Sequence, residues 1–241
     1  GQVSHTDSMV DPLTDLQINC WAQLSLLEAC RKRNPGATVV FAGTRQIYGR
    51  PKYLPVDEEH PVEPADINGV NKLAGEWYHV LYHRVHGLRT ATLRRTNTYG
   101  PRMQVDDGRV VSNFLVQALR RQPLTVQGTG EQTRSFCFVE DLVKGIYKLG
   151  STPKNDLRWI IMNLGNPFEV TINQLVDEVK RLVPNITIDK RPAAIDDPTR
   201  RKPDISRATE ALAWSPRVIL RQGLLETFEY FRAKLAEERA P

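Results

Sequence analysis

The chain has 241 residues, 40% of them hydrophobic, which is enough for one large domain or for a domain with a smaller appendage. Its formal charge of +5 comes from Lys and Arg residues that are interspersed with acidic ones, which favours a mixed solvated surface over a nucleic-acid platform. Three cysteines without CxxC spacing indicate neither a disulfide framework nor a zinc site. This cysteine pattern fits a reducing cytoplasm best, so we expect a cytoplasmic protein without nucleic-acid partners. No apolar run has membrane-spanning length and no signal-like segment opens the chain, so we expect no membrane partner.

The amino-terminal part alternates helix and strand signals. Near-helical spacing of apolar residues follows Asp11-Pro12 and predicts a helix up to residue 33. A short apolar run over 39–41 predicts a strand that is buried in a parallel sheet. The segment 42–49 is then a loop at the carboxyl end of that strand, where open α/β sheets bind their ligands.

A second helix and strand follow between Asp66 and Leu93. Gly87 lies just past the last helical residue and supplies a left-handed cap, and the strand 88–93 begins directly after it. The apolar residues of the helix recur at helical spacing, which predicts that they form one face packed against a sheet; they are Leu73, Trp77, Val80, Leu81 and Val85.

The remaining elements are shorter. The patterns predict strands over 124–126, 159–163 and 186–188 and a charged loop over 191–203. They predict helices over 110–119, 139–149 and 172–182, the last with Thr171 as its N-cap, and two further helices near Ala208 and Leu224. This alternation favours an open, mostly parallel α/β sheet.

Five motifs together resemble a known family: GTRQIYG at 43–49, NTYGPRM at 97–103, DGRVVSNF at 107–114, GTGEQTRSF at 128–136 with VEDLV at 139–143, and DDPTRRKPDI at 196–205. They resemble the extended short-chain dehydrogenase/reductases, NAD-dependent epimerases and dehydratases of nucleotide sugars, and most nearly UDP-glucuronate decarboxylases. The resemblance implies a Rossmann-like domain in residues 1–98 and 137–184, with a small α/β substrate lobe in 99–136 and 185–241.

The cofactor half of such an enzyme is incomplete in this sequence. The GxG at Gly128 and Gly130 lacks a third glycine and a following helix pattern, so a turn is the better interpretation. The chain therefore resembles a family member that begins after its first few strands, without the glycine-rich turn that holds the NAD pyrophosphate.

The resemblance also assigns roles to single residues. Thr44 and Lys72 match the family's catalytic hydroxyl and lysine, both of which also face the NAD. The family's catalytic Tyr position is Asn68 here, and Asn68 cannot ionise, so it positions a hydroxyl without removing its proton. The sequence leaves open whether another base substitutes, the chemistry is altered or activity is lost.

For a nucleotide-diphosphate sugar, the substrate-binding residues implied are Asn97, Arg109, Asn113, Arg134 and Arg201, with Val111 and Phe114 beside the nucleotide. No metal site is expected at His79, His83 and His86, because no Cys or carboxylate completes the set. The family commonly forms homodimers through the helices that correspond to 14–33 and 69–86.

Two functions from different classes remain. The first is an NAD-dependent nucleotide-sugar epimerase or dehydratase, or an enzyme of the UDP-glucuronate decarboxylase type, which oxidises its sugar by transient hydride transfer. The second is a catalytically impaired relative that still binds nucleotide sugars, an outcome that Asn68 permits. The sequence does not name the sugar, the base or the reaction.

Overall fold

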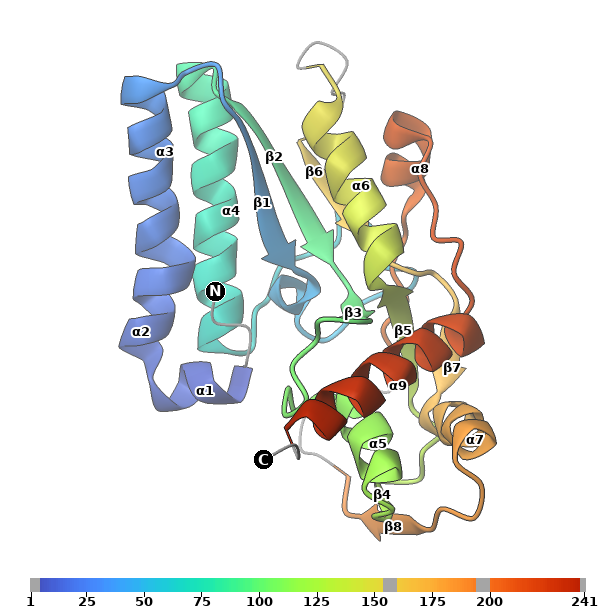
Figure 1. Cartoon of the computed structure of the whole chain (residues 1–241). Coiled ribbons are helices and arrows are strands. Elements are labelled where there is room, and N and C mark those ends of the chain that lie inside the picture. The colour runs from blue at the N-terminus through green and yellow to red at the C-terminus, as the bar shows by residue number, and fades with distance from the viewer. Residues whose placement is uncertain (1–4, 154–159, 194–199, 239–241) are drawn as a thin grey trace. The chain divides into compact units, whose positions relative to one another are not determined.

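The computed structural model describes residues 5–153, 160–193 and 200–238, whose elements are labelled in Figure 1. The helical segments are α1 (His5–Val10), α2 (Pro12–Leu16), the π-helix η1 (Gln17–Trp21), α3 (Ala22–Arg33), the 3₁₀ helix η2 (Arg45–Tyr48), α4 (Ile67–His86), α5 (Val110–Leu119), α6 (Val139–Ser151), α7 (Ile172–Leu182), α8 (Ser206–Leu212) and α9 (Leu220–Glu237). The strands are β1 (Thr38–Thr44), β2 (Arg89–Arg95), β3 (Asn97–Tyr99), β4 (Leu124–Gln127), β5 (Thr133–Phe138), β6 (Ile161–Leu164), β7 (Glu169–Thr171) and β8 (Ile188–Arg191).

The chain forms two compact units, which we call unit 1 (residues 1–96, 143–164 and 203–215) and unit 2 (residues 97–142, 165–202 and 216–241). Compactness alone assigns no role to either unit. The division into a cofactor domain and a substrate lobe therefore stays a prediction.

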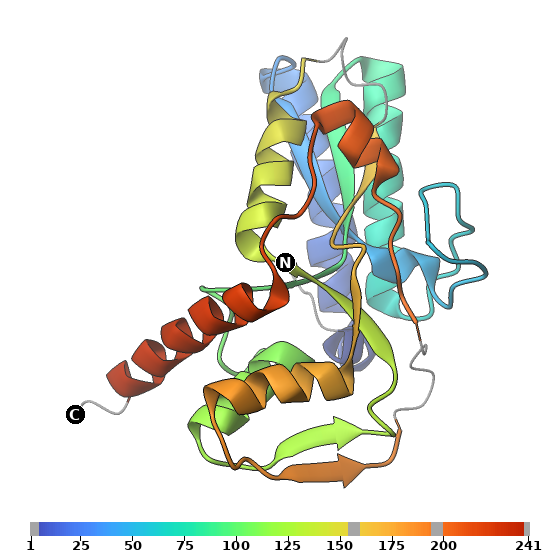
Figure 2. The ribbon, with the colours of Figure 1, turned by 90° about the vertical axis from the view of Figure 1, so that its right-hand side faces the viewer.

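Unit 1 is built on a parallel sheet of order β1-β2-β6. The α3 and α4 helices lie on one face of this sheet and α6 on the other, as Figures 1 and 2 show. His79 of α4 stacks on Phe41 on one face, whereas Gly150 of α6 approaches Val40 on the opposite face. The predicted parallel α/β architecture is confirmed.

Helix α4 begins and ends where its sequence predicts. The Asp66 side chain accepts a hydrogen bond from the Gly69 N–H at 2.6 Å, and Gly87 closes the helix with φ 67°. A non-glycine residue resists that left-handed conformation. These local contacts place the first turns of α4, which carry Asn68 and Lys72.

The predicted buried face of α4 is wrong in most of its positions. Val80 is 2% exposed, but Trp77, Leu81 and Val85 are 49%, 47% and 69% exposed. Most of the buried residues of α4 are instead small or polar. Asn68 and Asn71 bond to Asp15 of α2, Lys72 to β1 and Glu76 to β2. The buried residues of the helix other than Val80 are Asn68, Gly69, Asn71, Lys72, Gly75, Glu76 and His79. Hydrophobic periodicity therefore identified an exposed stripe rather than the core face.

Unit 2 contains two small sheets, β3-β5-β7 and β4-β8. Its apolar core comes from both sheets and from α5, α7 and α9, and it includes Phe114, Leu175 and Phe231 at 1% exposure or less. Thr171 caps α7 through the Gln174 N–H, as predicted. Strands β3, β5 and β7 were not predicted, because each is short and lacks a distinct alternation of apolar and polar residues.

Two predicted segments reach beyond the described residues. Trp159 of the strand predicted over 159–163 lies outside them, and the described strand is Ile161–Leu164. Part of the charged loop, residues 194–199, also lies outside them. Within the ranges that the structure covers, no helix combines the length and the apolar character that a bilayer crossing requires.

Candidate functional site

Thr44 and Lys72 lie together at the carboxyl end of β1. Thr44 is the last residue of that strand, and its hydroxyl accepts a hydrogen bond from the Gln46 N–H at 3.2 Å. Lys72 comes from α4, where its Nζ donates to the Ala42 carbonyl at 3.1 Å and lies 5.2 Å from the Phe41 ring centroid. The fold thus joins two residues of separate motifs at the sheet edge where α/β proteins bind ligands.

The environment of Lys72 disfavours its charge. Burial is the largest cause, and together with repulsion from Arg95 it lowers the pKa of Lys72 to about 8, although attraction by Asp15 acts in the opposite sense. The ammonium therefore loses its proton far more readily than that of an exposed lysine. An amine of this kind titrates near the working pH of many enzymes.

Asn68 belongs to a buried polar cluster around Asp15. The Asp15 carboxylate accepts the side-chain N–H groups of Asn19 at 3.1 Å, Asn68 at 2.9 Å and Asn71 at 2.8 Å. The Asn68 backbone N–H donates to the Ser8 hydroxyl at 3.2 Å, and the Asn68 side chain is buried. Its amide therefore links α4 to the amino-terminal helices. Sequence reasoning missed this cluster because its hydrogen-bonded partners are up to 60 positions apart.

A second buried network lies beside Thr44. Arg94 of β2 forms a two-pronged pair with Glu76 at 2.6 and 3.0 Å and donates to the Tyr48 hydroxyl at 2.9 Å. The Tyr48 hydroxyl donates in turn to Asn163 of β6 at 2.8 Å. Burial raises the pKa of Tyr48 to about 12 despite the nearby guanidinium, so Tyr48 is a packed, neutral phenol. This network joins η2, α4, β2 and β6.

In unit 2, the segments that carry Arg134 and Arg201 lie together. The Ser135 hydroxyl donates to the Arg201 carbonyl at 3.5 Å across 66 positions of sequence. Arg134 lies on β5, is buried and donates from Nη1 to the Thr133 carbonyl at 2.6 Å. The two segments that carry these arginines therefore adjoin each other, and the diphosphate role of the arginines stays a prediction.

The other predicted substrate residues of unit 2 occupy varied positions. Asn97 opens β3 and is half-buried. Arg109 is exposed, pairs with the Asp107 carboxylate (Nη2–Oδ2, 2.7 Å) and reaches the Thr98 carbonyl, and Asn113 donates to the Gly108 carbonyl at 2.9 Å. Val111 and Phe114 are buried in the apolar core of this unit. The roles of these residues stay predictions.

The three helical histidines differ in their surroundings. The Nδ1 atom of His79 lies 2.9 Å from the Gly75 carbonyl inside the fold, and that of His83 lies 3.0 Å from the Leu88 carbonyl, whereas His86 is exposed. Searched over the described residues, the structure has no group of three or more His, Cys, Asp or Glu residues arranged to hold a metal ion.

The parallel sheet of unit 1, with helices on both of its faces, places the chain in the class of Rossmann-like α/β proteins. The sequence profile of the NAD dependent epimerase/dehydratase family matches residues 1–165. The chain belongs to this family, which confirms the resemblance that its motifs carry.

Two relatives among those that match are UDP-glucuronic acid decarboxylases. The chain is 42% identical over 231 residues to UDP-glucuronic acid decarboxylase 3 of Arabidopsis thaliana, covering 93% of the chain and 66% of that protein. It is 39% identical to UDP-glucuronic acid decarboxylase 1 of Xenopus tropicalis, covering 95% of the chain and 55% of that protein. The chain thus spans less than two thirds of the length of these relatives.

Solved structures share the fold. A UDP-glucose 4-epimerase of Thermotoga maritima, solved with UDP-glucose, matches with a TM-score of 0.90 and 29% identity over 98% of this chain and 76% of that one. A UDP-glucuronic acid 4-epimerase of Bacillus cereus, solved with UDP-glucuronic acid and NAD, matches with a TM-score of 0.80 and 28% identity over 90% of this chain and 68% of that one. These matches confirm the predicted Rossmann-like fold.

Proposed function

We propose that the chain carries the substrate half and part of the cofactor half of an NAD-dependent nucleotide-sugar epimerase or dehydratase. An enzyme of the UDP-glucuronate decarboxylase type belongs to the same proposal, because relatives with that name cover 93% of the chain. The observation that supports it is that Lys72 donates to the Ala42 carbonyl, two residues before Thr44 at the carboxyl end of β1.

The residues present suit one part of the cofactor. Lys72 would bind the ribose beside the nicotinamide, and Thr44 would orient the reacting sugar hydroxyl. NAD, when bound, supplies a reversible hydride acceptor for the sugar carbon. The 241 residues contain no glycine-rich turn for a pyrophosphate, so the proposal assigns only the nicotinamide end of the cofactor to this chain. Calorimetry of the chain with NAD alone should therefore give no tight binding.

Arg134 and Arg201 would hold the diphosphate of the substrate, with Asn97, Arg109 and Asn113 around the nucleotide and sugar. The hydrogen bond between Ser135 and the Arg201 backbone supports a shared anion for the two guanidinium groups. In a calorimetric titration with UDP, Arg134→Ala or Arg201→Ala should weaken binding by roughly 1.5 to 3 kcal/mol, the range of a charged hydrogen bond.

Two comparisons make this titration decisive. Replacement by Lys keeps the charge and should recover only part of the affinity, because an ammonium lacks the two-pronged geometry. Arg181→Ala is the matched control, since Arg181 is an exposed arginine of the same unit that pairs only locally with Glu178. Unchanged UDP affinity in both Ala variants would refute the diphosphate site.

A second candidate function is a nucleotide-sugar-binding relative with impaired oxidation chemistry. The observation in its favour is Asn68, whose amide donates to the buried Asp15 and does not ionise, so it cannot act as the general base. Turnover of UDP-sugars by the complete gene product, with NAD present, separates the two candidates. If the wild-type protein turns over a UDP-sugar and Lys72→Met does not, the enzyme is supported. If both the wild type and Lys72→Met bind the substrate without turnover, the binding relative is supported.

We further propose a cytoplasmic homodimer. The apolar stripe on α4 (Val70, Trp77, Leu81 and Val85) is exposed, and Trp21 of η1 in the same unit is 66% exposed. A face of this kind is typical of a subunit interface. Light scattering should give twice the chain mass, and Trp77→Asp should give the single mass. A monomeric wild-type chain would refute this part.

A further inference from the structure

The residue in the position of the family's tyrosine lies inside the fold of unit 1. Asn68 is 1% exposed, and its Nδ2 atom donates to the Asp15 carboxylate at 2.9 Å. Its backbone N–H donates to the Ser8 hydroxyl at 3.2 Å, so Asn68 ties α4 to the amino-terminal helices. An amide does not ionise, and this one is committed to a buried carboxylate. The proposed oxidation therefore needs another group to remove the proton of the reacting hydroxyl.

The buried tyrosine and the buried glutamates of unit 1 already have partners. The Tyr48 hydroxyl accepts from Arg94 at 2.9 Å and donates to Asn163 at 2.8 Å, and burial raises the pKa of Tyr48 to about 12. Glu76 pairs with Arg94 at 2.6 Å, and Glu58 accepts the Asn163 N–H at 2.6 Å. These groups hold the fold together and are poor candidates for moving a substrate proton.

The two buried histidines of unit 1 are also poor candidates. His60 uses both ring nitrogens, with Nε2 accepting the Lys52 N–H at 2.9 Å and Nδ1 lying 2.7 Å from the Pro61 carbonyl. His79 is fully buried and follows Lys72 by two turns of α4, about 10 Å along the helix. Neither ring presents an unpaired nitrogen at the end of β1.

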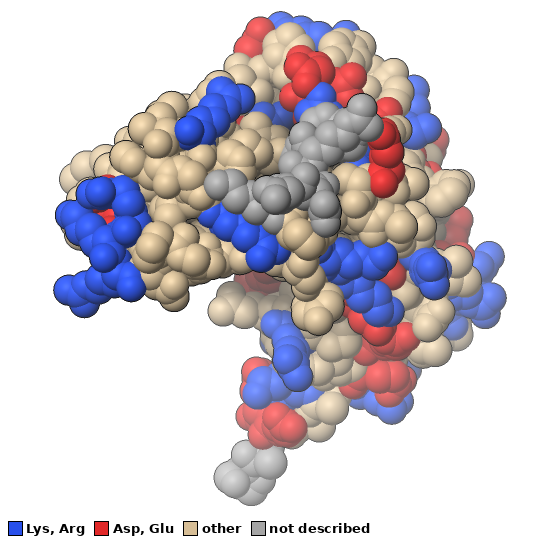
Figure 3. Space-filling view, turned by 90° about the horizontal axis from the view of Figure 1, so that it is seen from above, with Lys and Arg blue, Asp and Glu red and all other residues tan. Residues whose placement is uncertain are grey.

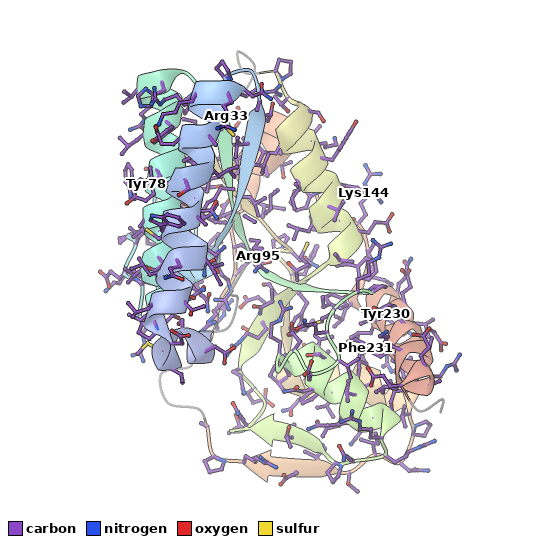
Figure 4. All side chains as sticks on the ribbon, turned by 60° about the vertical axis from the view of Figure 1, so that its left-hand side comes forward. Arg33, Tyr78, Arg95, Lys144, Tyr230 and Phe231 are labelled. Carbon is purple, nitrogen blue, oxygen red and sulfur yellow. The ribbon has the colours of Figure 1, made fainter. Side chains whose placement is uncertain are left out.

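Lys72 differs from these groups because it reaches the end of β1 and forms no ion pair with the described residues. Its Nζ atom donates to the Ala42 carbonyl at 3.1 Å and lies 5.2 Å from the centroid of the Phe41 ring. The charged groups that act on it from other elements are Arg95, which disfavours the ammonium, and Asp15, which favours it. Arg95 ends β2 as the register partner of Thr44, and Figure 4 shows it at that strand end. An apolar ring, a guanidinium and a single carbonyl together favour a neutral amine here.

We propose that Lys72 accepts the proton of the reacting hydroxyl, the role that a tyrosine holds elsewhere in the family. This inference rests on the proposed function and uses residues of unit 1 alone, with Thr44 orienting the hydroxyl. The O–H bond breaks and its proton goes to the Nζ lone pair, while the carbon gives its hydride to NAD and its bond to oxygen becomes a double bond. Return of hydride and proton regenerates the neutral amine. A neutral amine keeps two N–H donors, so Lys72 can also contact the ribose.

The protonation of Lys72 is measurable in the 241-residue chain without cofactor or substrate. In a chain labelled with ¹³C-lysine, the ε-carbon resonance that is missing from Lys72→Met belongs to Lys72, and its shift is followed against pH. Burial, the largest influence, lowers the pKa of Lys72 to about 8, so we expect a midpoint near that pH. A midpoint above pH 10 overturns the inference, because Lys72 would then be a permanent ammonium.

Lys72→Arg in the complete gene product separates proton transfer from charge. Arginine keeps the positive charge and the N–H donors but does not release its proton, so kcat for a UDP-sugar should fall roughly 100- to 10,000-fold. The wild-type kcat should rise with pH up to about 8 and then level off, and the residual rate of Lys72→Arg should lack this rise. Lys144→Arg, at an exposed lysine of α6 in the same unit, is the matched control and should keep the wild-type rate and profile.

The outcomes distinguish this inference from the proposed function. Wild-type kcat in Lys72→Arg, or the same pH profile in both proteins, overturns the inference while the proposed function stands. Absence of turnover in the wild-type complete gene product overturns the proposed enzyme, and this inference with it. If Lys72→Arg does not fold by circular dichroism, the resonance titration of the wild-type chain still decides.

Discussion

The two compact units fill their interiors with different chemistry. Among the described residues, the charged side chains buried in unit 1 are Asp15, Glu58, Lys72, Glu76 and Arg94, and several amides and hydroxyls are buried with them. In unit 2 the buried charged residues are Arg134 and Asp141, within a continuous apolar core. Unit 1 therefore adds hydrogen bonds to buried carboxylates to its apolar core, whereas the interior of unit 2 is mainly aliphatic and aromatic.

The candidate catalytic residues lie in unit 1, the unit that contains the buried polar networks. Thr44, Asn68 and Lys72 all belong to unit 1, and each takes part in a hydrogen bond that crosses between elements or caps one. Buried polar networks hold side chains in defined orientations when all their members are paired. The surface offers less contrast, since Figure 3 shows Lys and Arg interspersed with Asp and Glu over the face in view.

The largest effect should come from breaking the ion pair of unit 1. Arg94→Met leaves the Glu76 carboxylate buried without its partner, which costs about 3–5 kcal/mol of unfolding free energy. Urea unfolding followed by circular dichroism measures it. Arg181→Met, in an exposed ion pair of unit 2, is the control and should cost about 0–1 kcal/mol. Equal losses would contradict the contrast between buried and exposed pairs.

Shortening a buried apolar side chain of unit 2 should lower the unfolding free energy by a comparable or smaller amount. Leu175 of α7 is fully buried in the core, so Leu175→Ala removes buried methyl groups and leaves a cavity, at about 2–5 kcal/mol. Leu225→Ala, on the exposed side of α9, should stay within about 0.5 kcal/mol. A near-neutral Leu175→Ala would mean that this core is loosely packed.

The Asp15 cluster should show an intermediate effect. Asp15→Asn keeps the size but replaces one acceptor oxygen by a donor, so at least one of the three amides loses its partner, at about 1–3 kcal/mol. Asp11→Asn is the matched control, because Asp11 caps α2 at the surface and Asn caps a helix equally well. If both variants unfold at the wild-type urea concentration, the cluster contributes no stability.

The smallest effect concerns the pH dependence that Lys72 adds to stability. Its pKa is about 8 in the folded chain and 10.5 when unperturbed, so between these values the unfolded chain binds more protons. Stability from this group therefore rises as pH increases from 8 to 10.5. The difference in unfolding free energy between the wild-type chain and Lys72→Met should move in favour of the wild type over this window. A constant difference would show that Lys72 is well solvated.

Local signals in the sequence predicted much of the site's framework. The cap residues Asp66 and Gly87 bound α4 because capping involves only neighbouring backbone groups. The apolar run before Thr44 predicted the core of β1, although the strand continues to Thr44 itself. The motif match then located Thr44 and Lys72 on elements that do meet, because both elements were recognisable on their own.

The family, the parallel α/β class and the order of most elements were predictable from the sequence, because they depend on motifs, periodicity and caps within short stretches. Which face of α4 is buried depends on the tertiary structure, because Asn71 bonds to Asp15 and Glu76 to Arg94 across distant segments. The tertiary structure also decided that Arg94 is structural while its neighbour Arg95 is the register partner of Thr44. Strand pairing sets that distinction, and no spacing along one segment encodes which strand lies beside it.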